Sequence, residues 1–255
     1  MAKVRTLILR APGTNCDGET VYAFQQAEAD VSLVHINQLI HGEKRLAEYQ
    51  IMVIPGGFTY GDDIAAGKVL ANELKLKLGE DVVKFIESGG LILGICNGFQ
   101  VLVKAGFLPE PSNSGLPPLT LATNDSGKFE CRWIYLSINK NSPCVFTRGI
   151  EIMYLPVAHG EGKLVSLTPI SDENIALYYT DEKRNNKAGY PYNPNGSEDN
   201  IAGICDTSGR VFGLMPHPER YVRGTQHPQW TRQGVKKYGD GLKIFQNAVA
   251  WAKNL

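Results

Sequence analysis

One cysteine of the sequence stands in a pattern typical of an enzymatic nucleophile. Residues 94–98 read Gly-Ile-Cys-Asn-Gly and complete an apolar run that begins at Leu91. A nucleophile on a turn between a strand and a helix needs a strained backbone, so the residues two positions before and after it must be small. Both are glycine here, and a helix starting after Cys96 would favour a thiolate and direct the Asn97 N–H at a developing oxyanion. We therefore predict that Cys96 is a nucleophile; the alternative is a tight strand–helix joint that buries an inert thiol.

Two histidines compete for the role of the base that such a thiol requires. Each stands two residues before a glutamate and follows a predicted strand, in His159-Gly160-Glu161 and in His217-Pro218-Glu219. The spacing alone does not separate them. Because proline fixes the backbone dihedral between its neighbours, the second sequence favours a rigid pair of base and carboxylate.

A second oxyanion donor is indicated by Pro55-Gly56-Gly57, which follows an apolar run at 51–54. In open α/β sheets ligands collect at the carboxyl ends of the strands, and glycine lets main-chain N–H groups come close to them. A plain turn is the alternative. Cys16 also follows a predicted strand, but it lacks the elbow pattern and no helix is expected to start at the next residue. It is therefore a weaker candidate for the nucleophile.

The elements that must position these residues alternate through the first hundred positions. Apolar strands are predicted at 4–9, 31–36, 51–54 and 91–95, and amphipathic helices at 19–29, 81–87 and 99–104. Such alternation predicts an α/β fold with an open, mostly parallel sheet and helices on both faces.

The second half of the chain changes rhythm. Strands are predicted at 129–138, 151–156, 175–180, 201–205 and 211–215, with no helix until 241–253. We expect this half to complete the main sheet and add a smaller antiparallel layer, within one domain spanning 1–255. Two polar, turn-rich stretches, 181–200 and 221–239, are predicted to be loops or insertions.

The composition excludes several classes of protein. With 43% hydrophobic and 20% charged residues, the 255-residue chain is neither disordered nor fibrous. It carries 26 basic and 26 acidic residues, so it lacks the basic excess usual for proteins that bind nucleic acid or anionic membranes. No apolar run approaches the roughly 20 residues of a membrane span, and the start lacks a signal-peptide core. Five cysteines without a CxxC pair favour reduced thiols and a cytoplasmic location.

No cofactor or metal site is expected in this chain. Residues 61–69 resemble a phosphate-binding loop, but five residues rather than four separate Gly61 from Gly67, and Val69 stands where Ser or Thr would bind magnesium. The cysteines, histidines and acidic residues also lack the spacing of a metal site.

Taken together, these motifs resemble the class I, triad-type glutamine amidotransferases. Within that family the chain is most similar to the glutaminase subunits that serve the formylglycinamide ribonucleotide step of purine biosynthesis. The similarity extends over nearly the whole length, in residues 12–17, 55–62, 94–100, 158–162, 193–197 and 215–220. The elbow and His-Pro-Glu are typical of the class, and the segments at 12–17 and 158–162 are typical of the purine branch.

The resemblance implies a role for each matching residue. It separates the two histidines, because Cys96, His217 and Glu219 match the catalytic triad of the class. The main-chain N–H groups of Gly57 and Asn97 match its oxyanion hole. Four further positions match residues that bind glutamine in the family: Gln100, His159, Gly160 and Glu161.

The resemblance also implies a division of labour between subunits. Glutamine would be hydrolysed here, and the ammonia would pass through a channel to a separate synthetase subunit that uses ATP and magnesium, with a small bridging subunit in the complex. We therefore expect a docking face around the mouth of the Cys96 site. Residues 221–239, which carry four basic residues and Trp230, are either a loop packed on itself or part of that docking surface.

Three other functions remain possible from the residues alone. A cysteine hydrolase of the kind related to intracellular proteases would usually carry His directly after the nucleophile, where Asn97 stands. A non-catalytic subunit would be expected to have lost a member of the triad. An amidotransferase of another pathway would share the glutaminase chemistry and differ in the branch-specific segments.

Overall fold

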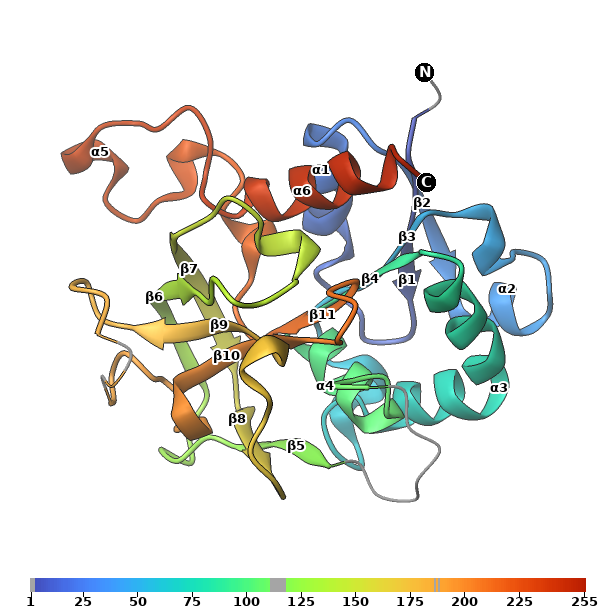
Figure 1. Ribbon diagram of the computed structural model, residues 1–255, viewed down its shortest axis with the longest axis horizontal. Coiled ribbons are helices and arrows are strands. Elements are labelled where there is room, and N and C mark those ends of the chain that lie inside the picture. Colours follow the sequence, from blue (N-terminus) through green and yellow to red (C-terminus); the bar gives the residue numbers. More distant parts are fainter. Residues whose placement is uncertain (1–2, 111–117, 186, 188) are drawn as a thin grey trace.

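A nine-stranded mixed sheet forms the centre of the computed structural model, which describes residues 3–110, 118–185, 187 and 189–255. The strand order is β2-β1-β3-β4-β11-β10-β9-β6-β7 (Figure 1). The first five strands are parallel, and the other four continue the sheet in antiparallel pairing. Their bounds are β1 Arg5–Arg10, β2 Asp30–His35, β3 Ile51–Ile54, β4 Leu91–Ile95, β6 Glu130–Ile138, β7 Ile152–His159, β9 Ile175–Thr180, β10 Ile201–Cys205 and β11 Val211–Leu214.

A second, two-stranded antiparallel sheet pairs β5 (Leu119–Thr123) with β8 (Glu161–Ser166). The predicted fold class is therefore confirmed. The antiparallel half mostly extends the main sheet, and among the described residues only this pair forms a separate layer.

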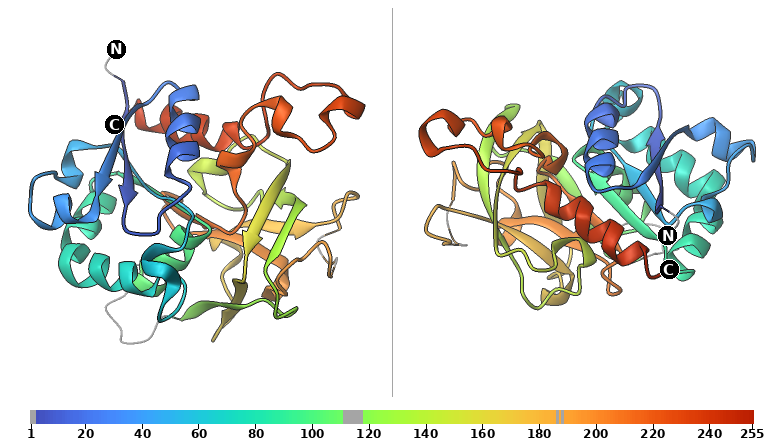
Figure 2. Two further views of the ribbon diagram at one scale, coloured as in Figure 1. Left: turned by 180° about the vertical axis from the view of Figure 1, so that it is seen from behind. Right: turned by 90° about the horizontal axis from the view of Figure 1, so that it is seen from above.

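Helices cover the parallel half of the sheet on both faces (Figure 2). On one face α1 (Asp17–Gln26) packs against α6 (Leu242–Ala252), with the rings of Phe24 and Phe245 5.0 Å apart. On the other face α3 (Lys68–Glu87) packs against α4 (Asn97–Ala105). The central strands β3 and β4 are buried at every residue, as continuous apolar strands of a parallel sheet should be.

Several elements differ from the sequence prediction. The helix predicted at 81–87 starts much earlier, at Lys68. Its first turns were missed because their apolar residues (Leu70, Leu74, Leu78) are spread among charged ones. The short helix α2 (Ile36–Ile40), β5, β8 and the four-residue helix α5 (Trp230–Gln233) were not predicted. None of the helices in the described ranges is long and apolar enough to cross a bilayer.

The parallel strands all end at the same edge of the sheet. The segments that follow β1, β3, β4 and β11 therefore meet there, and they carry Cys16, Gly57, Cys96 and His217 respectively. Strand β7 lies at the far edge of the sheet, but its end at His159 turns into β8 and contributes to the same region.

Candidate active site

Cys96 occupies a strained turn between β4 and α4. Its backbone lies at φ 52° and ψ −105°, a region rarely adopted by residues other than glycine. A Cβ on Gly98 would lie 1.9 Å from the Ile54 carbonyl oxygen, and one on Gly94 would lie 2.6 Å from a Leu102 methyl carbon. The prediction that both flanking residues must be small is thus confirmed by the packing of α4 against β3 and β4.

The Cys96 side chain lies at a small cavity of about 150 Å³. The thiol is buried, with Sγ 3.7 Å from the carbonyl oxygen of Ala158. The cavity is lined by the four residues predicted to bind glutamine, Gln100, His159, Gly160 and Glu161, and by the predicted oxyanion donor Gly57. Its other lining residues had no predicted role: Phe58, Asp62, Ala66, Phe129 and Ala158.

The two predicted oxyanion donors come from different elements. Asn97 is the first residue of α4, so its main-chain N–H has no acceptor within the helix. The side-chain oxygen of Asn97 accepts hydrogen bonds from the N–H and hydroxyl of Thr59, which fix the position of this residue. Gly57 has φ 148°, and a Cβ there would lie 2.7 Å from the Gly13 carbonyl oxygen. Only glycine therefore brings this main-chain segment to the cavity.

His217 and Glu219 form a buried pair after β11. His217 Nδ1 lies 2.6 Å from Glu219 Oε1, and the side chains are 1% and 0% exposed. Burial alone would lower the pKa of His217, but the negative charges of Glu219 and Cys96 outweigh it and raise that pKa well above its ordinary value. His217 Nε2 has no hydrogen-bond partner among the described residues, which leaves it for a reacting group.

Gly56 makes room for this histidine. A Cβ at position 56 would lie 2.8 Å from His217 Cε1. Gly57 of this segment was predicted to supply an oxyanion donor, whereas Gly56 had no predicted role. The signal was present in the paired glycines, but only the fold shows that the first of them faces the histidine ring.

The other histidine is held differently. His159 is buried, with Nδ1 3.1 Å from the Asn124 side-chain oxygen. Burial and the positive charge of His217 lower its pKa to about 4, so the ring is neutral near pH 7. Its sequence neighbour Glu161 does not contact it as Glu219 contacts His217, and forms an ion pair with Lys104 at 3.5 Å.

Gln100 connects the nucleophile helix to the opposite wall of the cavity. Its side-chain oxygen accepts from Asn97 Nδ2 at 3.0 Å, and its Nε2 donates to the Glu161 carbonyl oxygen at 2.6 Å. These bonds fix the first turn of α4 relative to the start of β8.

Cys16 lies beside the histidine–glutamate pair. Helix α1 begins at the next residue, Asp17, so the prediction that no helix starts there is wrong. The Cys16 sulfur accepts a hydrogen bond from Arg220 Nη2 at 3.1 Å, and ligand atoms of Cys16, His217 and Glu219 lie within 4.8 Å of one another. These three could together hold a metal ion, but in the structure His217 is bonded to Glu219 and Cys16 accepts from Arg220.

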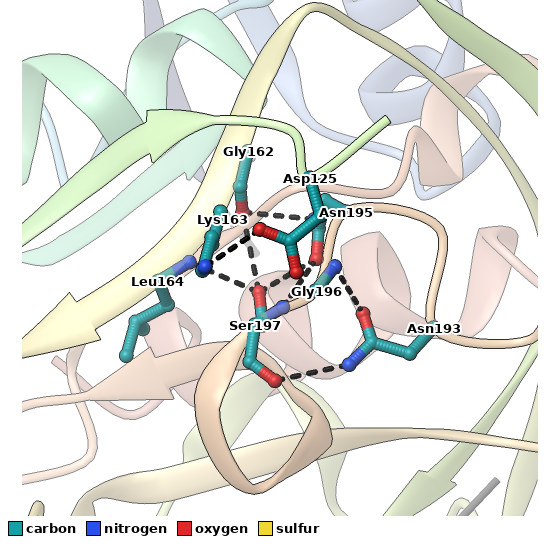
Figure 3. Close-up of polar contacts among 8 residues, drawn as sticks. All are labelled: Asp125, Gly162, Lys163, Leu164, Asn193, Asn195, Gly196 and Ser197. Carbon is teal, nitrogen blue, oxygen red and sulfur yellow. Dashed lines mark hydrogen bonds and ion pairs between the residues drawn. The ribbon is translucent and has the colours of Figure 1, made fainter. Parts of the chain in front are cut away.

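Part of the predicted 181–200 insertion supports the site from behind. Asn195 Nδ2 and Ser197 Oγ both donate to the Gly162 carbonyl oxygen, and Ser197 Oγ also accepts from the Leu164 N–H (Figure 3). Asn195 and Ser197 are buried. A Cβ on Gly162 would lie 2.6 Å from His159 Nδ1. The end of this stretch is therefore a buried polar network that holds β8 against His159, rather than a surface loop.

Comparisons with known proteins agree with this geometry. A family model described as a CobB/CobQ-like glutamine amidotransferase domain matches residues 3–252. Phosphoribosylformylglycinamidine synthase subunit PurQ of Dehalococcoides mccartyi is 59% identical over 256 aligned residues, which cover 100% of both chains. PurQ of Thermotoga maritima is 35% identical over 98% of this chain and 99% of its own.

Solved structures give the same result. In the structure of PurLQS from Thermotoga maritima, one chain matches with a TM-score of 0.77 and 33% identity, covering 98% of this chain and 99% of that chain. A glutamine amidotransferase from Thermotoga maritima matches with a TM-score of 0.51 at 17% identity, covering 100% of this chain and 94% of that chain, and so shares the fold.

Proposed function

We propose how the residues of this chain act from the family to which it belongs. The chain is a CobB/CobQ-like glutamine amidotransferase and, within that family, belongs to the PurQ subunits of phosphoribosylformylglycinamidine synthase. It is the subunit that hydrolyses glutamine to glutamate and ammonia, for the conversion of formylglycinamide ribonucleotide to formylglycinamidine ribonucleotide in purine biosynthesis. The roles of individual residues and subunits given below are our proposal.

Cys96 is the nucleophile of this mechanism. Its thiolate attacks the side-chain amide carbon of glutamine, and the carbonyl oxygen becomes an oxyanion. The main-chain N–H groups of Gly57 and Asn97 stabilise that oxyanion, as main-chain donors do in other acyl-transfer enzymes; losing one such donor costs about 10²–10³ in rate. The support is the strained turn at Cys96 and the glycine-dependent approach of residue 57 to the same cavity.

His217 moves the protons. As an imidazolium it protonates the departing amine, so that ammonia leaves and a γ-glutamyl thioester remains on Cys96. The neutral ring then removes a proton from water, which hydrolyses the thioester and releases glutamate. Glu219 keeps the ring oriented and stabilises its charged form, since it is bonded to Nδ1 and leaves Nε2 toward the reaction.

Four residues that line the cavity are proposed to hold the substrate: Gln100, His159, Gly160 and Glu161. No cofactor is proposed for this chain, because the hydrolysis uses its own side chains and main-chain N–H groups. ATP and magnesium are used by the partner synthetase.

The partners are proposed by analogy with the PurLQS structure. We expect this chain to assemble in the cytoplasm with an ATP-dependent synthetase and with a small bridging protein. Two half-exposed aromatic rings, Phe58 and Phe129, lie 6.5 Å apart at the cavity and would be part of the docking face.

The buried His217–Glu219 pair beside the Cys96 turn is the observation that carries this proposal. It is tested by measuring glutamate release from glutamine by the purified chain, alone and with the synthetase subunits and their substrates. Release that rises with the partners and is lost in Cys96→Ala supports the proposal. No release under either condition, or release that persists in Cys96→Ala, contradicts it and favours a hydrolase of another substrate or a regulatory subunit.

A further inference from the structure

A carboxylate in the wall of the Cys96 cavity has no role in the mechanism above. Asp62 ends a 3₁₀ helix (Thr59–Asp62) after β3 and lines the cavity together with Cys96 and Gln100. Its backbone is left-handed, at φ 53°, which is unusual for a residue other than glycine. Strain of this kind persists where the surrounding structure holds a residue in place, and it often marks a functional position.

The Asp62 carboxylate is held by two donors. The Gly67 N–H donates to Oδ1 at 3.0 Å, and Asn97 Nδ2 donates to the same oxygen at 3.1 Å. Asn97 is itself fixed by Thr59, so the carboxylate is rigidly connected to the residue that follows the nucleophile. Neither of these contacts uses Oδ2, and no donor among the described residues is bonded to it, so Oδ2 can accept from a ligand.

This wall of the cavity carries a net negative charge. Asp62 and Glu161 both line the cavity, and Lys104 is the cation that acts on both of them. Lys104 forms its ion pair with Glu161 and also donates to the Ala66 carbonyl oxygen. Burial and the charge of Glu161 raise the pKa of Asp62, the state expected of a carboxylate that lacks a cationic partner of its own.

Glutamine supplies such a cation. Its side-chain amide must reach Cys96, and its other end carries an ammonium and a carboxylate group. Since the inference rests on the proposed glutaminase function, it concerns how that substrate is recognised. We propose that Asp62 binds the α-ammonium group of glutamine and so makes the site selective for the free amino acid over amides that lack this group.

The test compares two substrates in the assembled complex with its synthetase. Asp62→Asn keeps the shape of the side chain and the Oδ1 acceptor but removes the charge. For glutamine, kcat/KM should fall by about 10–100-fold, mainly through KM, which is the usual worth of a hydrogen bond to a charged group. Glutaramate, the glutamine analogue without the α-amino group, should be a poor substrate of the wild type, and Asp62→Asn should release ammonia from it as fast as the wild type does.

The matched control is Asp63→Asn, an exposed carboxylate one residue away, which should leave both substrates unaffected. Equal losses of Asp62→Asn on glutamine and glutaramate would overturn the inference, because the carboxylate would then act by placing Asn97 rather than by binding the ammonium. An unchanged kcat/KM for glutamine would also overturn it. A wild-type complex that releases no ammonia from glutamine would instead contradict the glutaminase function itself. Unchanged turnover of glutaramate by Asp62→Asn would show that this variant is folded.

Discussion

Replacing Glu219 by glutamine should separate the structural from the catalytic role of the buried pair. The substitution preserves the side-chain shape and removes the charge 2.6 Å from His217 Nδ1. Burial, which lowers the pKa of His217, would no longer be outweighed by the carboxylate, so the pKa of His217 should fall. The amide can also orient the wrong tautomer, an effect that costs about 10⁴ in kcat in a serine-protease triad, and we expect a loss of about 10³–10⁴-fold here.

The effect on stability should depend on pH with a definite sign. In the wild type the folded-state pKa of His217 is raised, so protonated His217 stabilises the fold fully below its unfolded pKa of about 6.5. That contribution is lost as the pH rises through the higher folded-state pKa. Because both side chains are almost completely buried, removing one charge should cost about 3–5 kcal/mol near pH 6. Above the folded-state pKa the cost should shrink toward that of a lost neutral hydrogen bond, about 1 kcal/mol.

Two assays check this reasoning. Urea denaturation at pH 6 and pH 9 gives the free energy of unfolding, and glutamate release by the complex across pH gives the activity profile. The alkaline limb of kcat/KM should move to lower pH in Glu219→Gln, because His217 must be protonated to release ammonia. Glu80→Gln, which removes a carboxylate that is 93% exposed, is the control and should change neither. A destabilisation independent of pH together with an unmoved alkaline limb would refute the argument.

Other changes give outcomes that are simpler to measure. His159 has its pKa lowered to about 4, so the wild type should lose about 2 kcal/mol of unfolding free energy between pH 7 and pH 5 from this residue, and His159→Gln should abolish that loss in denaturant titrations. Gly98→Ala should destabilise the chain by at least about 3 kcal/mol, measured by urea denaturation, because a Cβ would lie 1.9 Å from the Ile54 carbonyl oxygen. Asn195→Ala, which removes a buried donor to Gly162, should lower stability by about 1–3 kcal/mol in the same assay. Residues 224–238 can be deleted because Arg223 and Tyr238, at the two ends of the segment, pair with each other. If the segment docks the synthetase, the deletion should weaken complex formation and slow ammonia transfer, measured by a binding assay and a transfer assay. Unchanged values would identify a loop packed on itself.

The features that could be predicted from the sequence depend on short-range chemistry. The turn at Cys96 requires glycines at fixed positions on either side, and the same five residues specify the end of a buried strand and the start of a helix. Continuous apolar runs likewise identify β3 and β4, because strands buried on both faces leave little choice of residue. In both cases, a few neighbouring residues are enough to predict the structure.

Other features depend on contacts between distant segments. The end of the 181–200 stretch is polar and turn-rich, and nothing in its sequence shows that Asn195 and Ser197 are buried beneath Gly162, more than thirty residues away. The long helix α3 was predicted only in its last turns, because its apolar positions become a buried side only through contacts with other segments, α4 above all. Asp62 belongs to a segment that was compared with a phosphate loop, and only the fold shows that it faces the cavity of the nucleophile.

The two histidines show why spacing could not choose between them. Both His-x-Glu sequences lie at the same site, one after β11 beside β4 and the other where β7, at the far edge of the sheet, turns into β8. Their environments, not their spacing, decide their roles: Glu219 bonds to His217, whereas Glu161 pairs with Lys104 and leaves His159 to Asn124.

Opposite pKa shifts then follow from these neighbours. His217 is paired with a carboxylate and lies close to a thiol, so its pKa is raised despite burial and it is suited to carry and return a proton. His159 has no contacting carboxylate to offset its burial and faces the positive charge of His217, so its pKa is lowered and it stays neutral. A second charged imidazole at the cavity would repel the protonated His217 and any substrate ammonium. In the proposed mechanism, a neutral His159 therefore preserves the negative wall formed by Asp62 and Glu161 for the amino-acid end of glutamine, while His217 acts at the other end, where the amide is broken.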